Sequence, residues 1–217
     1  ESEGGNCNVR IWGNFTDYTF TSIASATNAI GPLYVFRNVS NVSQRSPVNA
    51  NAATVDNEDR GPFNKCGSQD PEVRGGRTYL FHNTVLQPVQ AGYAYPRGMA
   101  GGPVDNGGAV ANIVSRNNIW QTYRENHPAI AEWQTSSSSN NSYDYDLFNG
   151  NPVIESAGGQ EVHGIRSLPI YADEVPLIGP SASGYFLSPG SPGADKGVRL
   201  FNFNDDYMGL GPDIGAY

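Results

Sequence analysis

The stretch that decides the fold is Leu80-Phe81-His82-Asn83-Thr84-Val85, a short apolar and aromatic run that reaches an Asn and then resumes. Runs that end in Asn recur three more times, as Ile11-Trp-Gly-Asn14, Val35-Phe-Arg-Asn38 and Val114-Ser-Arg-Asn117. Asp146-Leu-Phe148 looks like the tail of one further copy. A constant strand motif at unequal spacing is typical of stacked coils that carry loops of variable length. The pattern therefore predicts a stack of strands rather than a mixed globular fold.

The composition agrees with a turn-rich β protein. The chain has 217 residues, enough for one domain with a sizeable core, and contains 26 Gly and 15 Pro with only 16% charged residues. A net charge of -8 argues against general binding to nucleic acids or anionic membranes. No run of about 18 apolar residues is present, so the sequence predicts no membrane span.

The two cysteines and the start of the chain indicate an extracellular, processed protein. A disulfide between Cys7 and Cys66 is the favoured interpretation, and two buried thiols are the alternative. The chain opens without Met or a signal peptide, which predicts either signal cleavage or the loss of earlier coils.

Alternation along the strands predicts which side chains face inward. When the four runs are aligned on their Asn residues, the residue two positions before each Asn is predicted to share a face with the Asn side chain. The predicted interior residues are Trp12, Phe36, Phe81 and Ser115, with Asn14, Asn38, Asn83 and Asn117. Stacked interior amides can pass hydrogen bonds from one coil to the next.

The opposite parity puts three basic residues on the outer face, one before each Asn. Arg37, His82 and Arg116 are therefore the candidate catalytic residues. A column of Arg and His suits carboxylate or sulfate groups, and either residue can accept a proton if its pKa is lowered. The alternative is a solvated polar face with loops folded over it.

Two loops carry further candidates. Tyr93, Tyr95 and Arg97 lie in a Gly-rich insertion, where they would stack on sugar rings and pair with an acidic group, or else cover apolar surface or meet a partner. Asp56, Glu58 and Asp59 place three carboxylates in one loop, which suits Ca²⁺ or a solvated acidic turn. His163 is predicted to be a turn histidine rather than a ligand.

The runs resemble the right-handed parallel β-helix proteins, the pectin-lyase-like superfamily, and in particular secreted bacterial proteins of polysaccharide-lyase type. The supporting strings are Glu3-Gly-Gly-Asn-Cys-Asn-Val-Arg-Ile-Trp-Gly-Asn14, Gly31-Pro-Leu-Tyr-Val-Phe-Arg-Asn38 and Leu80-Phe-His-Asn-Thr-Val85. The most specific match is the tail, with Leu187-Ser-Pro-Gly-Ser-Pro-Gly-Ala-Asp195 and Gly211-Pro-Asp-Ile-Gly-Ala-Tyr217.

The resemblance implies an all-β solenoid, with coils over residues 1–150 and a loop-rich C-terminal closing segment over residues 151–217. It also implies an outer groove that binds polysaccharide, further upstream coils, and a lyase or hydrolase in which a basic residue abstracts a proton while Ca²⁺ or Arg neutralises a carboxylate. The alternative function is a non-catalytic extracellular scaffold or glycan-binding protein, whose coils stack end to end on upstream coils or another copy of the chain.

Overall fold

The computed structural model describes residues 2–4, 7–17, 23–28, 30–41, 64–65, 76–86, 112–121, 128–131, 140–153, 160–175 and 181–216. These residues form strands, turns and irregular segments, with no helix among them. Every pairing between the named strands is parallel. The predicted all-β class is thus confirmed for this part of the chain. The described residues include no helix long and apolar enough to cross a membrane.

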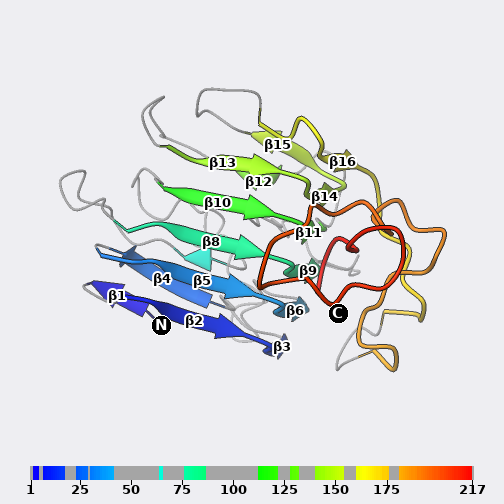
Figure 1. The fold of residues 1–217 in the computed structure, drawn as a ribbon, viewed down its shortest axis with the longest axis horizontal. Coiled ribbons are helices and arrows are strands. Elements are labelled where there is room, and N and C mark those ends of the chain that lie inside the picture. Colours follow the sequence, from blue (N-terminus) through cyan, green and yellow to red (C-terminus); the bar gives the residue numbers. More distant parts are fainter. Residues whose placement is uncertain are drawn as a thin grey trace, which may run out of the picture.

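Two large parallel sheets carry most of the strands. The five-stranded sheet contains β2 (Val9–Trp12), β5 (Leu33–Phe36), β8 (Thr78–Phe81), β10 (Ile113–Arg116) and β13 (Ser142–Asp144). The six-stranded sheet contains β3 (Phe15–Asp17), β6 (Val39–Asn41), β9 (Thr84–Leu86), β11 (Ile119–Trp120), β14 (Leu147–Phe148) and β16 (Ile165–Arg166). In Figure 1 the arrows of the five-stranded sheet lie above one another and point the same way.

Two smaller sheets complete the described strands. One contains β1 (Ser2–Gly4), β4 (Ile23–Asn28) and β7 (Asn64–Lys65). The other contains β12 (Pro128–Ala131) and β15 (Asn151–Val153). The chain thus visits the five-stranded sheet, the six-stranded sheet and often a smaller sheet in turn, then returns one strand further along.

A two-residue corner joins each strand of the five-stranded sheet to the next strand of the six-stranded sheet. Its first residue has a left-handed backbone in all five copies: φ is 66° at Gly13, 52° at Arg37, 52° at His82, 59° at Asn117 and 61° at Tyr145. Residues other than Gly rarely adopt this conformation, so the surrounding hydrogen bonds must hold it.

The second corner residues form a ladder of side-chain hydrogen bonds, which is buried except at its first member, Asn14. Its members are Asn14, Asn38, Asn83, Asn118 and Asp146. Each Asn donates its backbone N–H and its Nδ2 to the side-chain oxygen of the next member; for Asn83 and Asn118 Oδ1 the distances are 2.8 and 2.9 Å. The ladder satisfies amides that would otherwise be costly to bury.

The ladder confirms the predicted role of Asn14, Asn38 and Asn83, but the alignment of the fourth run was wrong. Asn118, not Asn117, occupies the ladder, because Ile119 pairs in register with Thr84. Asn117 is instead the left-handed corner residue between β10 and β11. Asn117 and Asn118 are adjacent in the sequence, so the fourth run could be aligned on either residue.

The predicted interior face was also wrong for three strands. Trp12, Phe36 and Phe81 lie on the outer face, whereas the neighbouring Ile11, Val35 and Leu80 pack into the core. The reason is the corner. Its left-handed residue interrupts the alternation, so parity counted backwards from the Asn is reversed.

Candidate functional site

The outer face of the five-stranded sheet presents two columns of side chains, because alternate residues of each strand point away from the core. The first column, in register, is Arg10, Tyr34, Tyr79, Val114 and Ser142. The second is Trp12, Phe36, Phe81, Arg116 and Asp144. We call the side chains of these two columns the outer face. It changes along the stack from aromatic at β2, β5 and β8 to polar at β10 and β13.

The aromatic half is built from stacked rings on neighbouring strands. Trp12 stacks on Phe36 with centroids 5.9 Å apart and planes 8° from parallel. Tyr34 stacks on Tyr79 at 4.9 Å and 12°. Trp12 is 62% exposed, and the guanidinium of Arg10 lies 6.0 Å from the centre of the Tyr34 ring. This half therefore offers flat apolar rings beside a cation.

The closing segment covers the middle of the outer face. Phe203 packs edge-on against Phe36 and Phe81, at centroid distances of 5.2 and 5.0 Å, and lies 5.6 Å from Tyr34. Phe81 is buried beneath it. Phe203 thereby separates the exposed aromatic rings near β2 from the polar half near β13.

The polar half begins with Arg116. Its guanidinium donates to the carbonyls of Ser115 and Ser142 at 2.6 and 2.9 Å and to Ser142 Oγ at 2.6 Å. No carboxylate of the described residues forms an ion pair with it. Arg116 is therefore held in place by neutral acceptors, and no described carboxylate pairs with its charge, which suits an anionic group of a ligand.

An exposed carboxylate–imidazole pair lies one strand further. Asp144 Oδ1 accepts the backbone N–H of His163 at 2.7 Å, and Asp144 Oδ2 lies 2.8 Å from His163 Nδ1. The His163 ring stacks on Tyr145 at 4.5 Å and 12°. Partial burial raises the pKa of Asp144, but hydrogen bonds from His163 and from the Tyr145 N–H outweigh it and hold that pKa below 3.8. Asp144 is therefore ionised, and its carboxylate fixes the position of the His163 ring.

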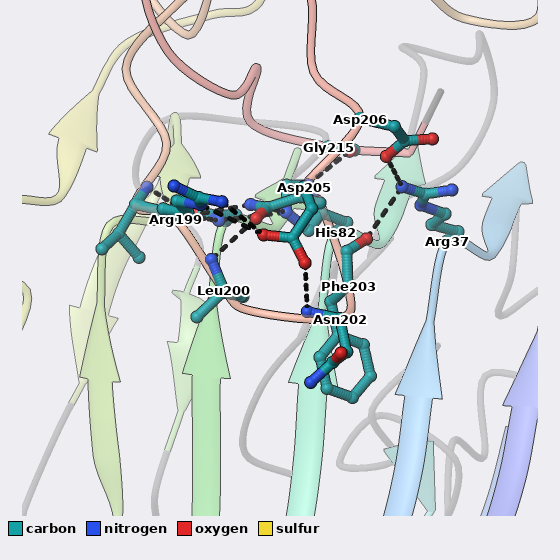
Figure 2. A network of polar contacts seen from close by, with 12 residues as sticks. Arg37, His82, Arg199, Leu200, Asn202, Phe203, Asp205, Asp206 and Gly215 are labelled. Atoms are coloured by element: carbon teal, nitrogen blue, oxygen red, sulfur yellow. Dashed lines mark hydrogen bonds and ion pairs between the residues drawn. The ribbon is translucent and has the colours of Figure 1, made fainter.

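Two residues of the predicted catalytic column, His82 and Arg37, have a structural role at the corners. Figure 2 shows His82 and Arg37 beneath the closing segment. His82 is 0% exposed, contrary to the prediction that it faces solvent. Its Nδ1 lies 3.2 Å from the Gly215 carbonyl, while Nε2 lies 3.1 Å from Asn117 Nδ2 and 2.8 Å from Asn204 Nδ2. Nδ1 must therefore donate and Nε2 accept, so the ring is neutral.

Burial is also the main reason why the pKa of His82 falls from 6.5 to about 4, although the hydrogen bond to the Gly215 carbonyl opposes the change. A low pKa was the property expected of a catalytic base. Here both ring nitrogens are already engaged by the protein, so in this structure the ring has no free nitrogen for a ligand.

Arg37 holds the closing segment as well. It donates to the carbonyl of Phe203 at 2.8 Å and forms an ion pair with Asp206 at 3.0 Å (Figure 2). Arg116 is one residue out of line with both, since it pairs in register with Phe81. The predicted single column of Arg37, His82 and Arg116 is therefore wrong: the first two lie at corner positions and the third on the outer face.

Several predicted site residues lie outside the described residues: Tyr93, Tyr95, Arg97, Asp56, Glu58, Asp59 and Cys66. The Cys7 thiol is exposed and free, and the disulfide with Cys66 stays a prediction. Among the described residues, no cluster of three or more His, Cys, Asp or Glu side chains is placed to hold a metal ion.

The sequence analysis missed the outer aromatic residues and the pair of His163 with Asp144. A signal for the former was present, because β2, β5 and β8 each carry bulky or cationic residues at their second and fourth positions. Asp144 and His163 are 19 residues apart, and only the return of the chain beside β13 brings them together.

Comparison with known proteins gives no family: the chain matches no protein-family model and no curated protein.

Proposed function

We propose that the strands are successive coils of a parallel β-helix and that the protein binds polysaccharide along the outer face. The first part is supported by the order in which the chain visits the sheets and by the repeated corner with its Asn ladder. A coil advances by about 4.8 Å, the spacing of neighbouring strands. A glycan laid across the strands would thus meet equivalent positions at regular intervals.

The observation that carries the binding proposal is the aromatic half, in which Trp12 is exposed and Tyr34 and Tyr79 are half-buried. Aromatic rings stack on the apolar faces of sugars, and rigid rings lose little conformational entropy on binding. Arg10 and Arg116 lie on the same face, three strands apart. Because guanidinium groups recognise carboxylates and sulfates, the proposed ligand is an acidic polysaccharide.

The test is affinity electrophoresis of the full chain in gels that contain uronate-rich, sulfated or neutral polysaccharides. We expect retardation by at least one acidic polymer, and a loss of about tenfold in affinity for Trp12→Ala and Tyr34→Ala. Phe186→Ala is the matched control, since this ring is 50% exposed and belongs to the closing segment rather than to the two columns of the outer face. Equal retardation of all variants, or none by any polymer, would refute the proposal.

A second candidate function, polysaccharide cleavage, is favoured by one observation: the exposed His163, 56% by side-chain area, is held by Asp144. A carboxylate that fixes one ring nitrogen leaves the other available for proton transfer. Arg116 on the adjacent strand would neutralise a substrate carboxylate. Incubation with acidic polysaccharides, followed by assays for unsaturated products and new reducing ends, tests this role. Activity that survives His163→Ala would exclude it.

The proposal implies a location outside the cell, where such polymers occur. The same setting permits the disulfide between Cys7 and Cys66. Peptide mapping of the native protein under non-reducing conditions tests that pairing. Recovery of both cysteines as free thiols would contradict it.

A further inference from the structure

The two ends of the stacked sheets differ in how well they cover the core. At the β2 end, Val9 and Ile11 are only half-buried, although their register partners Leu33 and Val35 are each 1% exposed. At the opposite end, Tyr143 of β13 is also 1% exposed. One end therefore leaves core side chains partly open, and the other is closed.

One side of the β2 backbone pairs with no strand in the described part of the chain. Val9 and Gly13 donate their N–H groups toward β5, to Pro32 O at 3.1 Å and Phe36 O at 3.4 Å. In a parallel strand, alternate residues direct their backbone groups to opposite edges. The backbone N–H and C=O groups of Arg10 and Trp12 thus point away from β5, toward the side where no described strand pairs with β2. Such an edge is a template for a further strand.

The hydrogen bonds of the ladder all run in one direction, and its first member, Asn14, lies at the same edge. Asn14 donates its N–H and Nδ2 to Asn38 Oδ1, at 3.1 and 2.9 Å. No described residue donates to Asn14 Oδ1, so the first member offers an acceptor. The last member, Asp146, is a carboxyl group, and its N–H donates to Oε2 of Glu161, which lies beyond the ladder, at 3.3 Å.

We propose that the edge formed by β2, Asn14 and β3 binds a partner polypeptide as one further coil. The partner segment is a parallel strand, a two-residue corner and a second strand. Its corner residue is an Asn that donates to Asn14 Oδ1, and an apolar residue three positions earlier covers Ile11. Added-strand recognition of this kind takes affinity from main-chain bonds and specificity from side chains.

A second copy of the chain does not fit this edge. Head-to-tail contact would present the β13 end, where Tyr143 already exchanges hydrogen bonds with Gln160 Oε1 and Glu161 N–H, both at 2.7 Å. Head-to-head contact would oppose two Asn14 acceptors. The net charge of -8 on each copy adds repulsion.

The experiment uses the full chain and a dye-labelled peptide copied from residues 76–86, which contains its own strand, corner and strand. In the register of the stack, Leu80 of the peptide would cover Ile11 and its Asn83 would reach Asn14. We expect saturable binding by fluorescence anisotropy. The same peptide with Asn83→Asp has no side-chain donor and should bind about tenfold more weakly.

Two protein variants locate the binding edge. Arg10→Pro removes an N–H that faces the open side and blocks pairing, whereas Arg10→Ala keeps it. Binding should be lost in the first and kept in the second, with similar thermal unfolding for both. Absence of peptide binding, equal binding to both variants, or equal binding of both peptides would overturn the proposal. If sedimentation shows that the protein self-associates and that Arg10→Pro abolishes the association, the proposed partner is wrong and a second copy of the chain occupies the edge.

Discussion

The buried carboxyl pair at the closed end of the ladder makes protein stability depend on pH, and Glu161→Gln should remove much of that dependence. Asp146 accepts hydrogen bonds from Asn118 N at 2.7 Å and Nδ2 at 3.0 Å, from Ser115 Oγ at 2.5 Å and from Trp120 Nε1 at 3.1 Å. Glu161 accepts one, from the Asp146 N–H. The four donors make Asp146 the carboxylate of the pair, so Glu161 keeps the proton.

The magnitude follows from the pKa of Glu161. Burial first, and the charge of Asp146 second, raise it from 4.5 to about 10. The unfolded chain loses this proton near pH 4.5, and the folded chain only near 10. Between these values the unfolded state binds fewer protons, so the free energy of unfolding falls by about 1.4 kcal/mol per pH unit. At pH 7 the accumulated loss is about 3 kcal/mol, and it vanishes below the lower value.

Gln at position 161 mimics the protonated acid. It has no ionisable proton, its carbonyl can accept the Asp146 N–H, and its amide can donate to the Asp146 carboxylate. We therefore expect Glu161→Gln to raise the free energy of unfolding by about 3 kcal/mol at pH 7 and by more at higher pH. Near the acid end of the range the variant and the native protein should be equally stable.

The assay is urea unfolding at a series of pH values between about 5 and 9 for both proteins. Glu174→Gln is the control, because it makes the same substitution at an exposed residue and should keep the pH dependence of the native profile. Infrared spectra add a second readout, since the band of a protonated carboxyl group at neutral pH should disappear in Glu161→Gln. Parallel profiles of native protein and variant, or a variant less stable at pH 9, would refute the reasoning.

Three other perturbations have defined outcomes. Asn83→Ala should lower the free energy of unfolding by about 3 kcal/mol in denaturant titrations, because the N–H and Nδ2 of Asn38 lose their buried acceptor; an effect under about 1 kcal/mol would contradict the ladder. In the native protein the free energy of unfolding should fall as pH falls from 6.5 to about 4, because the unfolded chain binds a proton at His82 and the folded chain does not. His82→Gln should flatten this part of the pH profile. Gly215→Ala should loosen the closing segment and speed its proteolysis, since φ is 103° and an added Cβ would lie 2.6 Å from Ile119 Cδ1 and 2.9 Å from Thr84 Oγ1; unchanged proteolysis would contradict this packing.

Much of the closing segment's chemistry was readable from its residue types. Asp side chains commonly accept hydrogen bonds from turn backbone. Asp205 accepts the Asn202 N–H at 2.6 Å, and Asp213 accepts the Asp195 N–H at 2.7 Å. Its place on the molecule was not readable. The bonds from Arg37 to Phe203 and from Gly215 N–H to the Asn117 carbonyl join residues far apart in the chain, and no local pattern encodes such contacts.

The candidate site shows the same division. Residue types led to the prediction of a sugar-binding site made of aromatic rings with Arg and His, and the structure places aromatic rings and Arg on the outer face. The residues chosen were only partly those that the structure places on the outer face: Arg116 lies there, whereas His82 is buried under the closing segment. His163 is predicted to be a turn histidine and does lie in a turn, but nothing near it in sequence indicates its partner Asp144.

The sequence by itself determined the strand runs, the all-β class and the repeated Asn at the corner, since these depend on alternation and on local backbone preference. The tertiary structure decided which face each strand turns outward. That choice depends on a single left-handed residue between strand and Asn, and its conformation is held by the ladder, by neighbouring strands and by the closing segment rather than by its own side chain. An inversion of parity at one residue moves every earlier side chain of the strand to the other face, which is why the aromatic half became visible only in three dimensions.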